Sequence, residues 1–172
     1  MKLLASWLAL LALVPALPFS GRATTFYVDA VSGDDFLNSG TSPGSPFKSI
    51  TKALASVSAG DTVSVNPGLY AYGAGSHERR FPLRIQDDSI RLIGVQIGTA
   101  VPRISAAGFE TTAGGPGFAA GVAPACIWVK HESAAVIHGV KIFGFLIDNT
   151  AYQTKKTDLL RCIEVTEAVG IS

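Results

Sequence analysis

The chain has 172 residues, of which 48% are hydrophobic and only 16% are charged. Its 18 glycines and 9 prolines exclude a helical bundle or a coiled coil, because such folds are rich in alanine, leucine, glutamate and lysine. The formal net charge of +1 gives no long-range field that would recruit nucleic acid or an anionic membrane. We therefore expect one globular domain, or part of one, with no nucleic-acid partner.

The first 23 residues have the features of a signal peptide. Lys2 supplies the positive charge, residues 3–14 are apolar, and Pro15 and Pro18 precede a cleavage site that we place after Ala23. The apolar run is shorter than the roughly 20 residues that a membrane-spanning helix needs. An uncleaved anchor is the alternative. We expect export to the periplasm, the cell surface or the medium, with no membrane span after removal of the signal.

Residues 24–60 are predicted to form a strand, a turn region and one capping helix. The aromatic and β-branched residues 25–29 predict a short strand, and the Gly-, Asn- and Asp-rich stretch 32–43 predicts turns. Ser45 is placed as the helix N-cap and Pro46 as the first helical residue. The apolar residues of this helix recur at steps of three and four and lie on one face: Phe47, Ile50, Leu54 and Val57.

A second strand is predicted directly after Gly60, which ends the helix. Residues 61–65 alternate polar and β-branched side chains, and the Asn-Pro-Gly sequence at residues 66–68 predicts a sharp turn. Leu69 and Tyr70 then resume the apolar pattern. We expect this strand to begin the apolar surface on which the helix lies.

Several stretches between Phe26 and Tyr70 carry a resemblance to a known family. They are Tyr27-Val28 with Gly33-Asp34, the turn sequence NSGTSP at 38–43, the helix sequence SPFKSITKAL at 45–54, and AGDTVSVNPGLY at 59–70. Together they resemble the opening of secreted right-handed parallel β-helix proteins, the pectate-lyase-like family, including an uncharacterised bacterial branch. The resemblance implies an architecture more than an activity, because this opening caps lyases, hydrolases, epimerases and surface proteins alike.

Later segments of the chain repeat one another, as a β-helix requires. Residues 83–93 match residues 127–137, and both contain an apolar strand, three polar residues, a serine and a second apolar strand. Residues 162–169 match the start of the same pattern, with Ile163 opposite Ile127. The repeats start 44 and 36 residues apart, which is longer than one bare coil of a β-helix needs. Insertions on one side of a solenoid would absorb the additional residues, and the segments 106–124 and 149–158 are the candidates.

The sequence therefore predicts an all-β fold, a right-handed parallel β-helix with one N-terminal amphipathic capping helix, in which residues 61–172 form the first coils. Stacked coils would bury continuous columns of aliphatic side chains. The third repeat stops in mid-pattern at Ser172, so we expect a fold that is incomplete at its C-terminus, where further coils or another chain cover the open end. An α/β sandwich is the alternative, but it would require more long helices.

The two cysteines occupy the same position of the repeat. In stacked coils, the Cα atoms of Cys126 and Cys162 would lie about 4.8 Å apart, within disulfide range, and export permits oxidation. However, side chains of a parallel ladder point the same way, which strains such a bond, and buried cysteines also stack as small apolar groups. A disulfide and a pair of stacked thiols therefore both stay open.

One calcium site is considered in the turn region. Asp34, Asp35 and Asn38 offer oxygen atoms to Ca²⁺, although their spacing is not that of a known calcium loop. The alternative is that these residues form turns. No other cofactor is expected.

Candidate residues for chemistry lie in the second repeat and beyond it. A β-elimination lyase needs a base that removes the proton α to a uronate carboxylate and a cation that stabilises the enolate, and Lys130, Glu132 and Asp148 are candidates for these roles. The alternative is a solvated face with ordinary ion pairs. Trp128 and Tyr152 are candidates for stacking on a sugar ring, against the alternative of packing.

In the lyases that this chain resembles, the base and the acidic cation ligands come from middle coils, so no activity is expected from the chain alone. Our first functional expectation is a secreted β-helix protein that binds extracellular polysaccharide of the uronate class and cleaves it in full-length form. The alternative is a non-catalytic cell-surface or adhesion module.

Overall fold

The structure is a computed structural model that describes residues 22–72, 78, 80–106, 126–130, 136–148, 163–165 and 168–169. Nearly all of the predicted signal peptide lies outside these residues. Within them, one short helix accompanies twelve strands, and no helix is long and apolar enough to cross a membrane. The elements are β1 (Thr25–Val28), α1 (Ile50–Leu54), β2 (Thr62–Val65), β3 (Leu69–Ala71), β4 (Leu83–Ile85), β5 (Arg91–Gly94), β6 (Arg103–Ser105), β7 (Ile127–Val129), β8 (Ile137–His138), β9 (Lys141–Phe143), β10 (Leu146–Asp148), β11 (Ile163–Val165) and β12 (Ala168–Val169).

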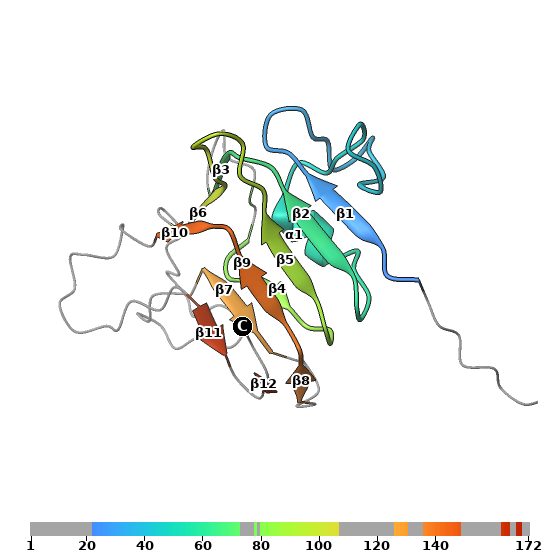
Figure 1. Ribbon diagram of the computed structural model, residues 1–172, viewed down its shortest axis with the longest axis vertical. Coiled ribbons are helices and arrows are strands. Elements are labelled where there is room, and N and C mark those ends of the chain that lie inside the picture. Colours follow the sequence, from blue (N-terminus) through green and yellow to red (C-terminus); the bar gives the residue numbers. More distant parts are fainter. Residues whose placement is uncertain are drawn as a thin grey trace, which may run out of the picture.

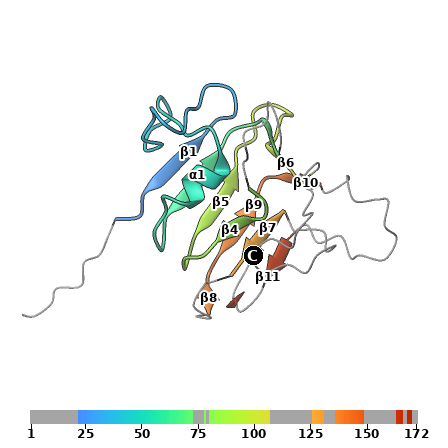
Figure 2. The same cartoon turned by 180° about the vertical axis from the view of Figure 1, so that it is seen from behind.

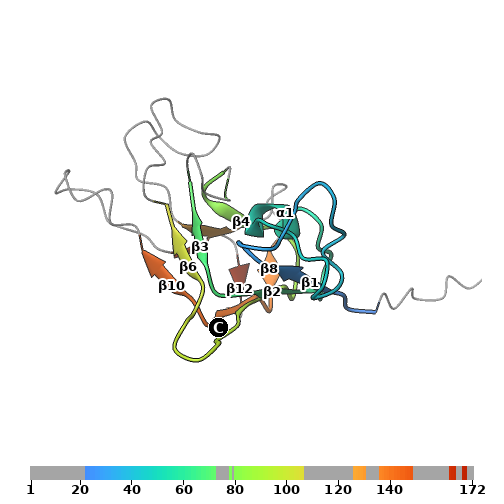
Figure 3. The ribbon, with the colours of Figure 1, turned by 90° about the horizontal axis from the view of Figure 1, so that it is seen from above.

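These strands form parallel sheets, which confirms the expected all-β class. The sheet orders are β1-β2-β5-β9, β10-β6-β3, β11-β7-β4 and β12-β8. From β2 onward the chain visits the three larger sheets in a fixed cycle, through β2 and β3, then β4, β5 and β6, then β7, β9 and β10, and back to β11. Figure 1 shows β1, β2, β5 and β9 side by side, and Figure 3 shows β3, β6 and β10 stacked along another side.

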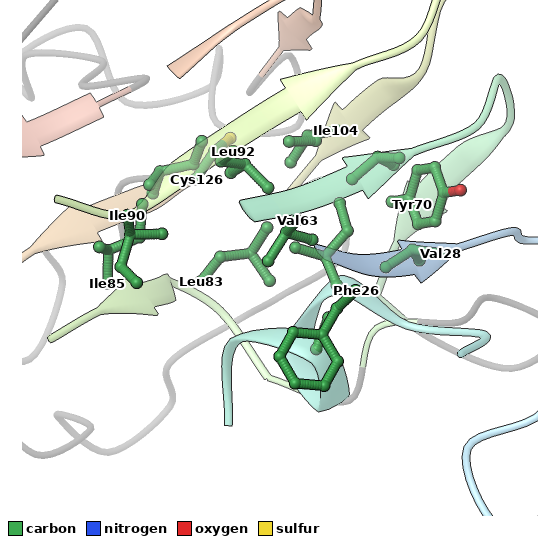
Figure 4. Close-up of a cluster of buried hydrophobic side chains, with 14 of the residues drawn as sticks. Phe26, Val28, Val63, Tyr70, Leu83, Ile85, Ile90, Leu92, Ile104 and Cys126 are labelled. Carbon is green, nitrogen blue, oxygen red and sulfur yellow. The ribbon is translucent and has the colours of Figure 1, made fainter. Parts of the chain in front are cut away.

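The core consists of apolar columns contributed by all three larger sheets. Because side chains alternate across a strand, every second residue of each strand points inward. The register places Val63 between Phe26 and Leu92 in one column, and it pairs Leu83 with Ile127 in another. Figure 4 shows Val63, Leu83 and Leu92 among the buried side chains that lie between the strands. Burial of each large aliphatic side chain contributes roughly 1.5–3 kcal/mol, so these columns are the main source of stability.

The predicted repeat is correct for its first strand and wrong for its second. Leu83 pairs with Ile127, and Ile127 pairs with Ile163, as the sequence match required. Arg91, however, pairs with Lys141 instead of Ala135, because the connection from β7 to β9 contains β8 and is longer than the turn from β4 to β5.

The third repeat also departs from the predicted register after its first strand. Ala168 pairs with Ile137, not with Glu132 as the match implied. The turn at Ser89 in the first repeat also departs from the match, which places Ser89 opposite Ser133. The amide of Ser89 donates instead to His138 O at 2.7 Å. The length of the connection therefore changes from one repeat to the next, while the first strands of the repeats pair within one sheet.

The capping helix starts later than predicted. Phe47 is extended and pairs with β1, since its amide donates to Tyr27 O (2.8 Å) and its carbonyl accepts from Asp29 N (2.9 Å). The N-cap is therefore Ser49, whose Oγ accepts from Lys52 N at 3.0 Å, and not Ser45. The helix also ends at Leu54, before the predicted end at Gly60, so Phe47 and Val57 of the predicted apolar face lie outside it. Ile50 and Ala53 form its buried side, and Leu54 is partly buried. The helix contacts β1, β2 and β4, and Figure 2 shows it in front of the sheet that contains β1 and β2.

Candidate functional site

A tryptophan with two neighbouring cations lies on the outward-facing side of the β4-β7-β11 sheet. Arg84 lies between two inward residues of β4 and pairs in register with Trp128 on β7. The guanidinium carbon of Arg84 is 5.2 Å from the centroid of the indole ring, and Lys130 Nζ is 5.5 Å from it. Both distances lie within the range of a cation–π interaction. The two cations therefore fix the position of a partly exposed aromatic ring.

A groove with a volume of about 110 Å³ lies between α1 and β4, and Arg84, the residue that contacts the Trp128 ring, is part of its wall. Arg80 and Arg84 contribute positive charge to its wall, and Thr51 and Gln86 are its other polar lining residues. No acidic side chain is found among the described residues of this wall. A volume of this size accommodates a few water molecules or one carboxylate group. The arrangement is suited to an acidic group attached to a molecule that also contacts Trp128.

Glu78 is a buried acid that the sequence did not reveal, because it lies in the polar run at residues 77–80. Its side chain is 1% exposed and caps the start of α1. Oε1 accepts from Ile50 N at 2.6 Å, and Oε2 accepts from Thr51 N at 3.0 Å and from the Thr51 hydroxyl. Burial raises the pKa of Glu78 above its usual value, although these three donors oppose the shift. Because Thr51 also lines the groove, Glu78 holds one wall of the candidate site.

The three calcium candidates are engaged with the backbone of the turn region. Asp34 Oδ1 accepts from Phe36 N and Leu37 N, and these bonds lower the pKa of Asp34. Asp35 accepts from the amides of Lys48 and Ser49 and from the Ser49 hydroxyl.

Asn38, the third candidate, donates from Nδ2 to Pro46 O at 2.7 Å. Across the described residues, no group of three or more His, Cys, Asp or Glu side chains is placed to hold a metal ion. These hydrogen bonds give the three side chains a part in shaping the loop, and a calcium site at Asp34, Asp35 and Asn38 stays a prediction.

The catalytic candidates are distributed over different sheets. Lys130 follows β7, in the sheet that contains Trp128, whereas Asp148 ends β10, in the sheet with β3 and β6. Glu132 and Tyr152 lie outside the described residues. The structure therefore does not assemble Lys130, Glu132 and Asp148 into one described site.

The cysteine pair is only half covered by the described residues. Cys126 is fully buried directly before β7. The register of β7 and β11 pairs Ile127 with Ile163, the residues that follow the two cysteines. Cys162 itself lies outside the described residues, so the choice between a disulfide and stacked thiols stays a prediction.

Comparison with known proteins places the chain in a family. A family model described as a protein of unknown function (DUF1565) matches residues 31–169, which is well over half of the sequence. No curated protein and no solved structure matches the chain significantly. The match includes Trp128, Lys130 and every strand from β2 to β12. The chain therefore belongs to the family of proteins of unknown function DUF1565.

Proposed function

We propose that this chain forms the N-terminal coils of an exported right-handed parallel β-helix protein that binds an acidic polysaccharide. The observation that carries this proposal is the partly exposed aromatic ring of Trp128 with Arg84 and Lys130 close to it, where Arg84 also lines, with Arg80, the groove between α1 and β4. An exported protein with this face meets polysaccharides of cell walls and extracellular matrices. In full-length form the proposed activity is cleavage of a uronate polymer.

The chemistry of the face matches that of an acidic sugar. An indole ring packs against the apolar C–H face of a pyranose, as aromatic rings do against apolar surfaces generally. An arginine binds a carboxylate through two parallel hydrogen bonds, which also fixes the orientation of the sugar. Because Arg84 lies between Trp128 and the groove, a sugar ring over Trp128 directs its carboxylate toward Arg84 and Arg80.

The strand cycle supports the proposed β-helix. Each passage through the three larger sheets adds one parallel strand to each of them, which is how a solenoid of stacked coils grows. Along the described chain, the last strands added to these sheets are β9, β10 and β11. A strand at the edge of a sheet presents unpaired backbone groups, and in our proposal C-terminal coils or another chain cover this edge.

One observation favours the alternative, a non-catalytic surface module. The loop between β1 and α1 exposes three large apolar side chains, Val31 at 86%, Phe36 at 80% and Leu37 at 87%. Hydrogen bonds from the backbone to Asp29 and Asp34 hold this loop in place. Ordered, exposed apolar residues are typical of contact surfaces for other macromolecules.

Affinity electrophoresis in gels that contain polygalacturonate tests the proposed binding. Trp128→Ala is expected to weaken binding about tenfold, equivalent to ~1.4 kcal/mol, because the stacking surface is lost. Trp128→Phe is expected to retain part of the affinity, and Ile97→Ala, at an exposed apolar residue between β5 and β6, is the matched control. Equal migration of the wild type and Trp128→Ala contradicts the proposal.

Cleavage is tested separately by the ultraviolet absorbance of unsaturated products in the presence of calcium. The chain alone is expected to give flat traces with uronate polymers, and the full-length protein is expected to give rising ones. Flat traces from the full-length protein across several uronate polymers would leave binding without cleavage and favour the surface module.

A further inference from the structure

The outward-facing side of the β1-β2-β5-β9 sheet carries two exposed cations in adjacent positions. Arg91 on β5 pairs in register with Lys141 on β9, and both side chains are exposed. Neighbouring strands are about 4.8 Å apart, so the two side chains leave the sheet close together. Thr25 and Thr62 continue the same row on β1 and β2.

Two like charges that face each other across neighbouring strands destabilise a sheet. No carboxylate relieves this pair from within the face, because its two rows, as far as they are described, contain only neutral or cationic residues. The nearby carboxylate of Asp88, in the turn before β5, instead accepts a hydrogen bond from the backbone amide of His138 through Oδ1. An external anion that bridges Arg91 and Lys141 would remove the repulsion.

The second row of this face carries two aromatic residues, one aliphatic residue and one serine. It lies two residues further along each strand, on the same side as the cations, and Phe143 is its most accessible member at 51% exposure. The row consists of Tyr27, Ser64, Ile93 and Phe143. Cations in one row and aromatic carbon in the next fit a ligand with both charged groups and apolar ring faces.

We propose that this face is a second binding surface for a linear acidic polysaccharide. The polymer crosses the strands, so that its carboxylate or sulfate groups contact Arg91 and Lys141 and a sugar ring lies over Phe143. A nucleic acid is disfavoured, because the net charge of +1 supplies no wider field to hold a dense polyanion. The proposal shares no residue with the Trp128 face, so the two stand or fall separately.

The test compares the double variant Arg91→Gln, Lys141→Gln with wild type in gels that contain polygalacturonate or dextran sulfate, at several NaCl concentrations. We expect about a tenfold loss of affinity and a weaker dependence on salt, because two screened charge contacts are removed. Phe143→Ser is expected to weaken binding at every salt concentration. Lys52→Gln, at an exposed lysine on α1, is the matched control and is expected to bind like wild type.

The outcomes separate this proposal from the proposed function. If the double variant binds both polymers like wild type, this second surface is overturned, whatever Trp128→Ala shows. If Trp128→Ala binds like wild type but the double variant does not, this surface stands and the Trp128 face fails. Tighter retention in gels that contain duplex DNA than in either polysaccharide gel would overturn the choice of ligand. Urea midpoints no lower than that of wild type show that unfolding is not the cause of a loss, and the double variant is expected to be slightly more stable because the repulsion between Arg91 and Lys141 is removed.

Discussion

Replacing Glu78 with alanine is expected to lower the free energy of unfolding by about 3 kcal/mol. The substitution leaves the amides of Ile50 and Thr51 without their acceptor, and a buried donor that loses its partner costs roughly 1–3 kcal/mol. Glu78 also forms a parallel β-bridge with Tyr72, so its side chain links this bridge to the start of α1. Without that link, the helix is expected to pack less firmly against the strands.

Glu78→Gln separates the charge of this side chain from its shape. The amide keeps one acceptor oxygen for Ile50 N, but its NH₂ group faces Thr51 N, which then has no acceptor. Glu78→Gln is therefore expected to be less stable than wild type, by about 1–2 kcal/mol at neutral pH.

The difference between wild type and Glu78→Gln is expected to depend on pH. Burial raises the pKa of Glu78 above its usual value of about 4.5, and the nearby carboxylate of Asp35 adds to the shift. Folding therefore takes up a proton between the unfolded and the folded pKa. The resulting stabilisation is fully present below pH 4.5 and is lost as the pH rises through the folded pKa. The advantage of wild type over Glu78→Gln is thus largest in acid.

Urea denaturation followed by tryptophan fluorescence from pH 4 to pH 8 measures these differences. Asp87→Asn, at a partly exposed acid in the turn after β4, is the matched control and is expected to change stability little. A Glu78→Ala protein within about 0.5 kcal/mol of wild type, or a gap between wild type and Glu78→Gln that widens as the pH rises, would contradict this account of Glu78.

The sequence reveals the first strand of each repeat because its inward positions carry the same kind of apolar side chain. Leu83, Ile127 and Ile163 pair in register on β4, β7 and β11, so an alignment of the apolar residues in the sequence finds this register. The register of the second strands cannot be found in this way, because a turn can gain or lose residues while the strands that follow it still pair. The pairing of Arg91 with Lys141 depends on such a turn, and no local pattern predicts its length.

The candidate site is only partly visible in the sequence. Trp128 is identifiable as an outward residue by its place between Ile127 and Val129. Its partner Arg84 becomes apparent only through the register of two strands far apart in the chain. Glu78 is the clearest omission, because a charged residue among His77, Arg79 and Arg80 has the local signature of a solvated loop. Its burial follows from the free amides at the start of α1, a tertiary requirement that composition does not record.

Gly94→Ala is expected to destabilise the protein by about 2–3 kcal/mol, because two turns approach each other through bare backbone at this position. A Cβ atom on Gly94 would lie 2.1 Å from the carbonyl oxygen of Gly144 and 2.8 Å from Pro102 Cγ. The oxygen belongs to the backbone and cannot rotate away, so the connections that follow β5 and β9 would have to separate. The adjacent bond from Leu146 N to Pro102 O, at 3.0 Å, would be strained as well.

The matched control for this substitution is Gly44→Ala. A Cβ atom at Gly44 meets no atom within 4 Å, and its backbone does not have a positive φ. Gly44→Ala is therefore expected to leave stability unchanged or to raise it slightly, since alanine lowers the entropy of the unfolded chain. Thermal unfolding by circular dichroism compares both variants with wild type. If both substitutions shift the midpoint equally, the backbone contact between Gly94 and Gly144 does not determine how closely β5 and β9 pack, and the side-chain columns alone do so.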